Sequence, residues 1–227
     1  MDEGGERLSG FVLAGGRSTR MGMDKALAVV GGRPMIEIAV GILREAGVQV
    51  EIAGARSDLS NYAPVVPDTF VDAGPLGGVH AALASSRAEF CVFLPVDMPL
   101  MPAEVLCALI DRAVESSAGA TFFRLEGHAE PFPVVLWRAE MLSVIAERLS
   151  KGECGCLAAW LAAGNGPGAE GAQGLRAEDV AAAGLTSQLR GISPELWFQG
   201  ANTPEELAQV DGSYRRGRAR AGGNRVS

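Results

Sequence analysis

Apolar stretches of strand length alternate along this chain with stretches of helical periodicity. Short apolar runs predict strands at 9–14, 48–54, 63–68 and 89–97. The fourth run, EFCVFLPVD, is apolar almost throughout, which is typical of a central parallel strand covered on both faces. Two further strands are predicted within 119–137, on either side of a turn at Glu126 and Gly127.

Helices are predicted between these strands, where apolar residues recur every three or four positions. The first begins near Pro34, carries its apolar residues on one face and ends at Gly47. Further helices are predicted at 74–86, 102–117 and 139–152. The alternation of strand and helix predicts an α/β fold of the doubly wound kind, with a mainly parallel sheet and helices on both faces in three α/β/α layers.

The pattern weakens after Gly152, where an Ala- and Leu-rich helix runs into a Gly- and Ala-rich loop at about 164–191. It becomes clear again at Thr203, which suits an N-cap, with Pro204 in the first turn and Glu206 completing a capping box. We expect residues 1–213 to form a single domain.

Charge is unevenly distributed along the chain. The formal net charge is -7, yet the last 14 residues, YRRGRARAGGNRVS, hold five arginines and no acid. Residues 1–213 therefore carry 15 basic and 27 acidic side chains, which makes the domain a poor partner for nucleic acid. Residues 214–227 are predicted to be a basic, disordered tail, and an RNA or membrane contact is the alternative.

No apolar run reaches the ~18–20 residues of a membrane span, and the acidic, Gly-rich N-terminus does not resemble a signal peptide. We therefore expect a cytoplasmic protein that does not enter the membrane. Cys91 and Cys107 are predicted to be small buried hydrophobes. Cys154 and Cys156 have the spacing of metal ligands but lack a second pair, so a structural zinc is not predicted.

The stretch from residue 10 to residue 35, GFVLAGGRSTRMGMDKALAVVGGRPM, follows the first strand with two glycines and then three cations. Arg17, Arg20 and Lys25 suit an anion that the bare backbone approaches closely. The stretch matches neither G-x-x-x-x-G-K-[ST] nor G-x-G-x-x-G. A surface loop with solvated arginines is the alternative.

The segment LAGGRSTRMGMDKA resembles the signature of the molybdenum cofactor guanylyltransferases, the MobA family of nucleotidyltransferases. The segments PDTFVDAGPLGG, LPVDMP and NTPEEL follow in the order found in that family. The resemblance implies a Rossmann-like nucleotidyltransferase fold. It also implies transfer of GMP from GTP to the terminal phosphate of Mo-molybdopterin, with Mg²⁺ as cofactor and release of pyrophosphate.

The resemblance also implies functional residues at the carboxyl edge of the sheet, where α/β proteins bind ligands. The implied nucleotide contacts are Leu13, Ala14, Gly15, Gly16, Lys25, Asp68 and Asp97. The implied catalytic residues are Lys25, Arg20 and Asp97, and Asp97 is the expected metal ligand. Cations and a metal are needed because two unit charges ~4 Å apart repel by ~4 kcal/mol at an effective dielectric near 20.

Other roles stay open for several of these residues. Asp97 could cap the following helix, and Asp68 could serve in a turn, with Asp72 as its nearest competitor. Asn202 suits a contact with metal or substrate, or a turn ahead of Thr203. The glycines at 74, 77 and 78 suit a close approach of the backbone to the ligand, a helix whose N-terminus faces the ligand, or a plain tight turn.

The chain also departs from the family pattern. Many members carry an asparagine after the second strand and another where Gly200 stands. In this chain the first is replaced within AGARSD, so that a backbone group or Arg56 must take its place. Gly15 is the form that the guanylyl branch carries, whereas the cytidylyl branch has alanine there.

Three functions remain open at this point. The first is the molybdopterin guanylyltransferase, acting as a monomer or weak oligomer with transient contacts to other molybdenum-cofactor proteins. The second is a related enzyme with another nucleotide or acceptor, such as a molybdopterin cytidylyltransferase or a phospho-metabolite guanylyltransferase. The third is a nucleotide-binding regulatory protein without catalysis.

Overall fold

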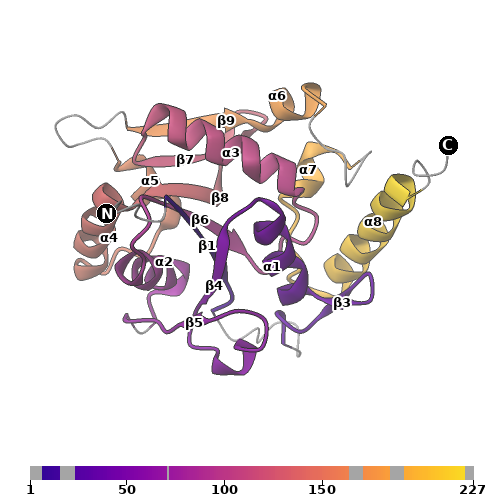
Figure 1. Cartoon of the computed structure of the whole chain (residues 1–227), viewed down its shortest axis with the longest axis horizontal. Coiled ribbons are helices and arrows are strands. Elements are labelled where there is room, and N and C mark those ends of the chain that lie inside the picture. The colour runs from indigo at the N-terminus through magenta and orange to yellow at the C-terminus, as the bar shows by residue number, and fades with distance from the viewer. Residues whose placement is uncertain (1–6, 16–23, 71, 164–170, 185–191, 223–227) are drawn as a thin grey trace, which may run out of the picture.

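The computed structural model describes residues 7–15, 24–70, 72–163, 171–184 and 192–222. These residues form a seven-stranded sheet in the order β5-β4-β1-β6-β8-β7-β9 (Figure 1). The strands are β1 (Leu8–Leu13), β4 (Gln49–Ala53), β5 (Val65–Val66), β6 (Phe90–Pro95), β7 (Ala120–Leu125), β8 (His128–Trp137) and β9 (Ala172–Arg176).

The sheet is mainly parallel, as predicted. β1 pairs in parallel with β4 and β6, β4 with β5, and β7 with β9. β8 is antiparallel to both of its neighbours, β6 and β7, so it alone among these seven strands runs the opposite way. The doubly wound α/β fold is confirmed.

Helices cover both faces of the sheet, because alternate residues of the central strands point to opposite sides. Phe11 and Phe93 lie in a core cluster with α2, α4 and α5, whereas Val12 and Val92 lie in a cluster with α1 and α3. The helices are α1 (Met35–Glu45), α2 (Gly74–Ser85), α3 (Ala103–Ser116), α4 (Arg138–Ser150), α5 (Cys156–Leu161), α6 (Ala177–Ala182), α7 (Pro194–Trp197) and α8 (Pro204–Gly222), with a 3-10 turn η1 at Ser57–Leu59. Figure 1 shows these two groups of helices on either side of the sheet.

A two-stranded ribbon, which the sequence interpretation missed, lies between β1 and α1. It consists of β2 (Val29–Val30) and β3 (Arg33–Pro34), joined by Gly31 and Gly32. Both glycines have positive φ, as tight hairpin turns require, so the Gly-Gly pair was the available signal.

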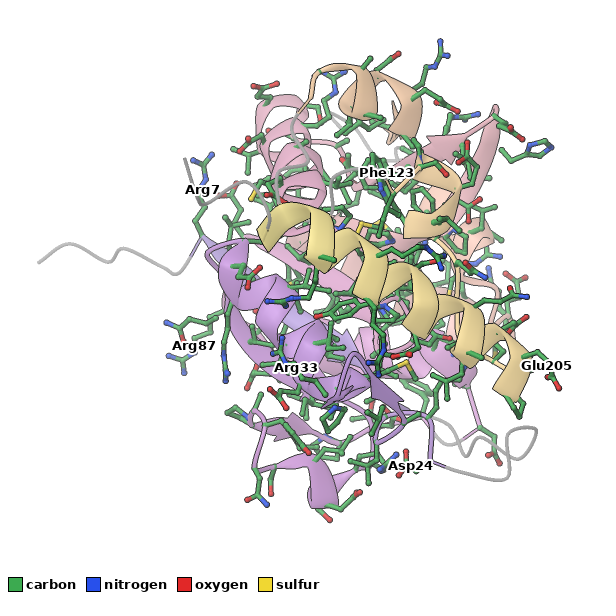
Figure 2. The ribbon with its side chains drawn as sticks, turned by 90° about the vertical axis from the view of Figure 1, so that its right-hand side faces the viewer. Arg7, Asp24, Arg33, Arg87, Phe123 and Glu205 are labelled. Atoms are coloured by element: carbon green, nitrogen blue, oxygen red, sulfur yellow. The ribbon has the colours of Figure 1, made fainter. Side chains whose placement is uncertain are left out.

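The expectation of a disordered tail from residue 214 was wrong for the part that the structure describes. α8 continues to Gly222, and Tyr214 is buried. Its ring lies over Gly31, and the Gly31 N–H donates to Asp211 Oδ1 at 2.7 Å. Figure 2 shows α8 crossing the molecule from Glu205, with Arg33 of the ribbon beside its second half. The expected boundary at 213/214 therefore falls inside a packed helix.

The Gly- and Ala-rich stretch after residue 163 is also more ordered than expected, since β9 and α6 lie within it. β9 pairs with β7 through backbone groups, which small side chains do not prevent, and α6 buries Ala177 and Val180. Cys91 is buried as predicted, but Cys107 is only half-buried. Within the part of the chain that the structure describes, none of the helices combines the length and apolar character that a bilayer-spanning segment needs.

Candidate active site

The carboxyl ends of the four parallel strands β5, β4, β1 and β6 meet at one edge of the sheet. Leu13 pairs with Ala53 on one side and Pro95 on the other, and Ala53 pairs with Val66. The segments that leave these strands therefore start side by side. They carry Gly15, Arg56, Asp68 and Asp97. This is the edge of the sheet that the sequence predicted for ligand binding.

Three polar side chains from distant parts of the chain meet at this edge. Lys25 Nζ donates to Asp97 Oδ2 at 2.8 Å and to Asn202 Oδ1 at 2.6 Å. The Lys25 and Asp97 side chains are only 22% and 20% exposed. The structure thus brings together two residues that were predicted to be catalytic, and it adds Asn202 to them.

The loop before α8 holds Asn202 in place. Ala201 N–H donates to the Asp97 carbonyl at 3.3 Å, and Glu206 Oε2 accepts from Asn202 N–H at 2.7 Å and Thr203 N–H at 3.1 Å. Thr203 Oγ1 in turn accepts from Glu206 N–H at 3.1 Å. The predicted capping box is therefore confirmed, and it orients the residue that contacts Lys25.

Gly200 leaves room for this group of side chains. A Cβ at this position would lie 2.9 Å from Asn202 Nδ2 and 3.3 Å from Asp97 Oδ2. The glycine that departs from the family pattern therefore lies directly beside the Lys25 contacts. A larger residue here would have to displace the amide of Asn202 from its present position.

Asp97 does not cap the next helix, which was its alternative role. α3 begins at Ala103, its N-cap residue is Pro102, and no side chain makes a cap hydrogen bond there. Asp97 follows β6 by two residues, and its carboxylate contacts Lys25. Its position favours the functional interpretation.

A second group of residues surrounds Asp68. A Cβ at Gly15 would lie 3.8 Å from Asp68 Oδ2, and a Cβ at Gly78 would lie 3.3 Å from Asp68 Oδ1. Asp68 as a residue is exposed, but its carboxylate lies between these two backbones, and the partial burial raises its pKa. The competitor Asp72 instead has φ 58° in the turn before α2.

Close backbone approach explains Gly54 at this edge. Gly54 has φ 137°, and a Cβ there would lie 2.9 Å from Gly15 N and 3.0 Å from Gly15 Cα. The loops after β4 and β1 therefore touch through bare backbone. Gly74 starts α2, so the glycines at 74, 77 and 78 belong to a helix and not to a plain tight turn. Their contact with a ligand stays a prediction.

Of the remaining predicted site residues, some lie within the part of the chain that the structure describes and others lie outside it. Leu13 and Ala14 have buried side chains. The Leu13 carbonyl accepts from Val96 N–H, and Ala14 N–H donates to the Ala53 carbonyl, so these two backbone groups are already hydrogen-bonded within the fold. The nucleotide contacts of Leu13 and Ala14 stay predictions. Gly16 and Arg20 lie outside the described residues, as does Arg17, and their roles stay predictions.

The fold and this edge define a class: an α/β protein whose parallel strands end at the edge where such folds bind ligands, with a partly buried lysine between an acid and an amide. Comparison with known proteins specifies the class further. A family model described as a MobA-like NTP transferase domain matches residues 10–166. The chain belongs to this family, and it is a nucleotidyltransferase.

Relatives of known name agree with this assignment. A probable molybdenum cofactor guanylyltransferase from Flavobacterium johnsoniae is 33% identical over 150 residues, which cover 65% of this chain and 77% of that protein. A molybdenum cofactor guanylyltransferase from Xanthomonas euvesicatoria is 46% identical over 104 residues, which cover 45% of this chain and 53% of that protein.

Solved structures share the fold. The molybdopterin-guanine dinucleotide biosynthesis protein A from Archaeoglobus fulgidus superposes with a TM-score of 0.72 at 21% identity, covering 92% of this chain and 99% of that one. A manganese complex of Rv0371C from Mycobacterium tuberculosis superposes with a TM-score of 0.52 at 21% identity, covering 76% of this chain and 88% of that one. The expected family resemblance is confirmed.

Proposed function

We propose that this protein transfers GMP from GTP to the terminal phosphate of Mo-molybdopterin in the cytoplasm, with Mg²⁺ as cofactor and release of pyrophosphate. The observation that carries the proposal is the contact of Lys25 with Asp97 and Asn202 at the carboxyl edge of the sheet. The names of the guanylyltransferase relatives support the choice of nucleotide and acceptor.

Lys25 is suited to stabilise negative charge that develops on the triphosphate. Its ammonium group is held by two oxygens from different segments, so it needs little reorganisation when substrate binds. Preorganised charge of this kind is worth more in a partly buried site than in open water. Transfer between phosphates depends mainly on positioning and charge stabilisation, which is what this arrangement supplies.

The residues present also fit a magnesium ion. Asp97 Oδ2 and Asn202 Oδ1 both contact Lys25 Nζ, so an ion would bind through the other carboxylate oxygen of Asp97, next to the space that Gly200 leaves open. In the described part of the chain, no three His, Cys, Asp or Glu side chains are grouped to hold a metal. Asp97 would therefore hold the ion together with substrate phosphates and water, as Mg²⁺ prefers. When bound, the metal supplies further neutralisation of phosphate charge.

Replacing Lys25 tests the proposal. Lys25→Ala is expected to lower kcat for pyrophosphate release from GTP and Mo-molybdopterin by roughly 10²–10³, while the protein stays folded. The matched control is Lys151→Ala, because Lys151 pairs with Glu147 of α4 at 2.6 Å, and α4 packs on the face of the sheet opposite to the core cluster that holds Ala26. Turnover near that of the wild type at saturating substrate would contradict the role of Lys25.

Nucleotide choice is tested separately by thermal stabilisation with GTP, CTP, ATP and UTP in the presence of magnesium. A ligand that binds the native state at 100 times its Kd adds about 2.7 kcal/mol to stability. We expect GTP to raise the Tm most. Equal shifts for all four nucleotides, or none, would contradict guanylyl transfer independently of the lysine variant.

A further inference from the structure

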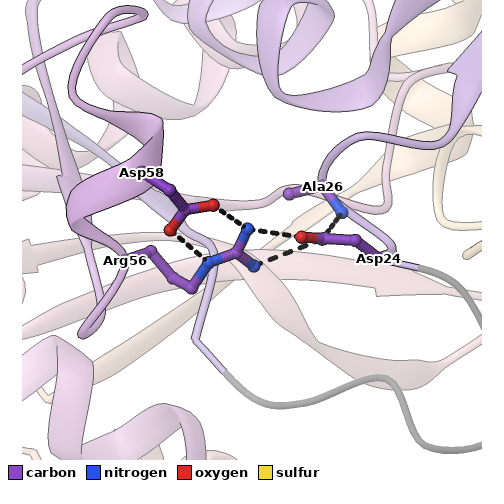
Figure 3. A network of polar contacts seen from close by, with 4 residues as sticks. All are labelled: Asp24, Ala26, Arg56 and Asp58. Atoms are coloured by element: carbon purple, nitrogen blue, oxygen red, sulfur yellow. Dashed lines mark hydrogen bonds and ion pairs between the residues drawn. The ribbon is translucent and has the colours of Figure 1, made fainter.

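Arg56 joins two loops at the edge of the candidate site, and the proposed reaction does not yet use it. The residue follows β4, and its guanidinium group lies between two carboxylates (Figure 3). It donates to both oxygens of Asp24 at 2.5 and 3.2 Å, and to both oxygens of Asp58 at 2.7 and 2.9 Å. Each contact is bidentate, a geometry that arginine supports and lysine does not.

Asp24 organises the turn that carries Lys25. Its Oδ1 accepts from Ala26 N–H at 3.0 Å, and its carbonyl accepts from Leu27 N–H at 3.2 Å. The Lys25 carbonyl accepts from Ala28 N–H, also at 3.2 Å. A continuous chain of hydrogen bonds thus runs from Arg56 through Asp24 to the turn whose lysine contacts Asp97.

Arg56 is not available as a free cation for phosphate groups. Its side chain is 20% exposed, and the hydrogen bonds that it donates to Asp58 and to Asp24 raise its pKa. Two carboxylates already offset its single charge, so the three groups together carry a net charge of -1. This environment suits a structural connector and does not suit the direct nucleotide contact that was an alternative in the sequence.

We propose that Arg56 is a positioning residue for Lys25: it fastens the Asp24–Lys25 turn to the loop after β4 and so sets the place of the ammonium group at the site. The proposal rests on the proposed function, because it assigns Arg56 a part in the same reaction. Its consequence is kinetic. Displacement of a catalytic group by ~1 Å can cost roughly 10²-fold in rate, so loss of Arg56 should act mainly on kcat.

The test compares Arg56→Ala, Arg56→Lys, Asp24→Asn and the double variant Arg56→Ala/Asp24→Asn. The matched control is Arg148→Ala, since Arg148 is 24% exposed and pairs with Glu153 at 2.9 Å. It lies on α4, which packs on the face of the sheet opposite to the core cluster of Ala26 and Ala28. We expect Arg56→Ala and Asp24→Asn each to lower kcat by roughly 10- to 100-fold. The double variant should be no slower than the slower single one, Arg56→Lys should lie between, and Arg148→Ala should match the wild type.

Hydrogen exchange provides a second readout that does not require activity. The amides of Ala26 and Ala28 should exchange faster in Arg56→Ala than in the wild type, and at the wild-type rate in Arg148→Ala. Unchanged exchange, an unchanged kcat in Arg56→Ala, or additive losses in the double variant would overturn the proposal. If the wild type transfers no GMP, the proposed function fails, and the exchange comparison still decides whether Arg56 holds the turn.

Discussion

Gly15 lies where the chain leaves β1, and its surroundings show what an added methyl group would meet. A Cβ there would lie 3.8 Å from Asp68 Oδ2 and 3.9 Å from Gly54 Cα, which are ordinary van der Waals distances. Gly15 does not have the positive φ that restricts a position to glycine. The fold therefore tolerates alanine at this position. An effect of the substitution on nucleotide preference would come from contact between the added methyl group and the bound nucleotide.

Gly15→Ala is expected to lower the preference for GTP over CTP by about one to two decades while the Tm stays close to that of the wild type. A purine needs more room beside the loop than a pyrimidine, and differences of this size are worth only ~1–3 kcal/mol. The measurement is kcat/KM for both nucleotides in both proteins. An unchanged ratio, or a wild type that prefers CTP, would favour the cytidylyl alternative.

Asp68 gives a prediction about pH. Partial burial raises the pKa of this carboxyl above its ordinary value of 3.8. The folded state therefore loses stability relative to the unfolded state as the pH rises through the raised pKa. Asp68→Asn removes the ionisable group and with it this loss of stability. The Tm of the variant should therefore exceed the wild-type Tm at about pH 7.5. The two Tm values should approach each other at about pH 3, where Asp68 is protonated in both the folded and the unfolded wild type.

Asp58 is the matched control with the opposite sign. The hydrogen bond from Arg56 lowers the pKa of Asp58, so this carboxylate contributes stability above its unfolded pKa and loses it as the pH falls through the folded value. Asp58→Asn should therefore lower the Tm near neutrality and have no effect in strong acid. The same sign of effect for both variants would rule out burial as the cause of the Asp68 shift.

At the scale of elements, α8 and the β2–β3 ribbon behave as one packed unit. Two arginines of α8 have partners within the helix: Arg215 Nε donates to Asp211 Oδ2 at 2.7 Å, and Arg218 NH1 donates to the Tyr214 hydroxyl at 3.2 Å. Tyr214 then presents its ring to Gly31. Arg215 and Arg218, which made this segment resemble a solvated tail, instead support a helix that buries the side chain of Tyr214.

Substitutions at the two turn glycines of the ribbon distinguish the cost of backbone strain from the cost of overpacking. Both have positive φ, 59° for Gly31 and 84° for Gly32, but a Cβ at Gly31 would lie 2.5 Å from two Tyr214 ring carbons, whereas nothing lies within 4 Å of one at Gly32. Gly32→Ala should cost ~1–2 kcal/mol from conformation alone. Gly31→Ala should cost a further ~1–3 kcal/mol from overpacking.

The measurement is the Tm of each variant, and a chain of this length loses about 2–4 °C per kcal/mol. A chain that ends before Tyr214 should also be less stable than the wild type, because it lacks the ring and half of α8. Equal losses in the two glycine variants would show that α8 does not pack on the ribbon in solution.

At the scale of the whole molecule, the sheet assembles the site from segments that lie far apart in sequence. Lys25 is 72 residues from Asp97 and 177 residues from Asn202. The C-terminal segment contacts the first part of the chain at two places. Asn202, just before α8, contacts Lys25, and Asp211 and Tyr214 of α8 contact Gly31 of the ribbon. The C-terminal helix therefore belongs to the same packed structure as the first loop.

Much of this architecture was predictable because hydrophobic periodicity is a local property. The apolar run of β6, the capping box at Thr203 and the glycine that starts α2 each depend on a few neighbouring residues. The carboxyl ends of parallel strands share one edge of the sheet, so the sequence alone predicts that Lys25, Asp68 and Asp97 lie at the same edge.

The sequence by itself thus determined the α/β class, the parallel centre of the sheet and the edge that carries the site. Only the tertiary structure decided which groups meet: Asn202 with Lys25, Arg56 with Asp24, and Tyr214 with Gly31. The physical reason is that these contacts join residues with no periodic relation to each other. Their energies depend on distances that the packed sheet and helices set, and no local pattern of residues encodes those distances.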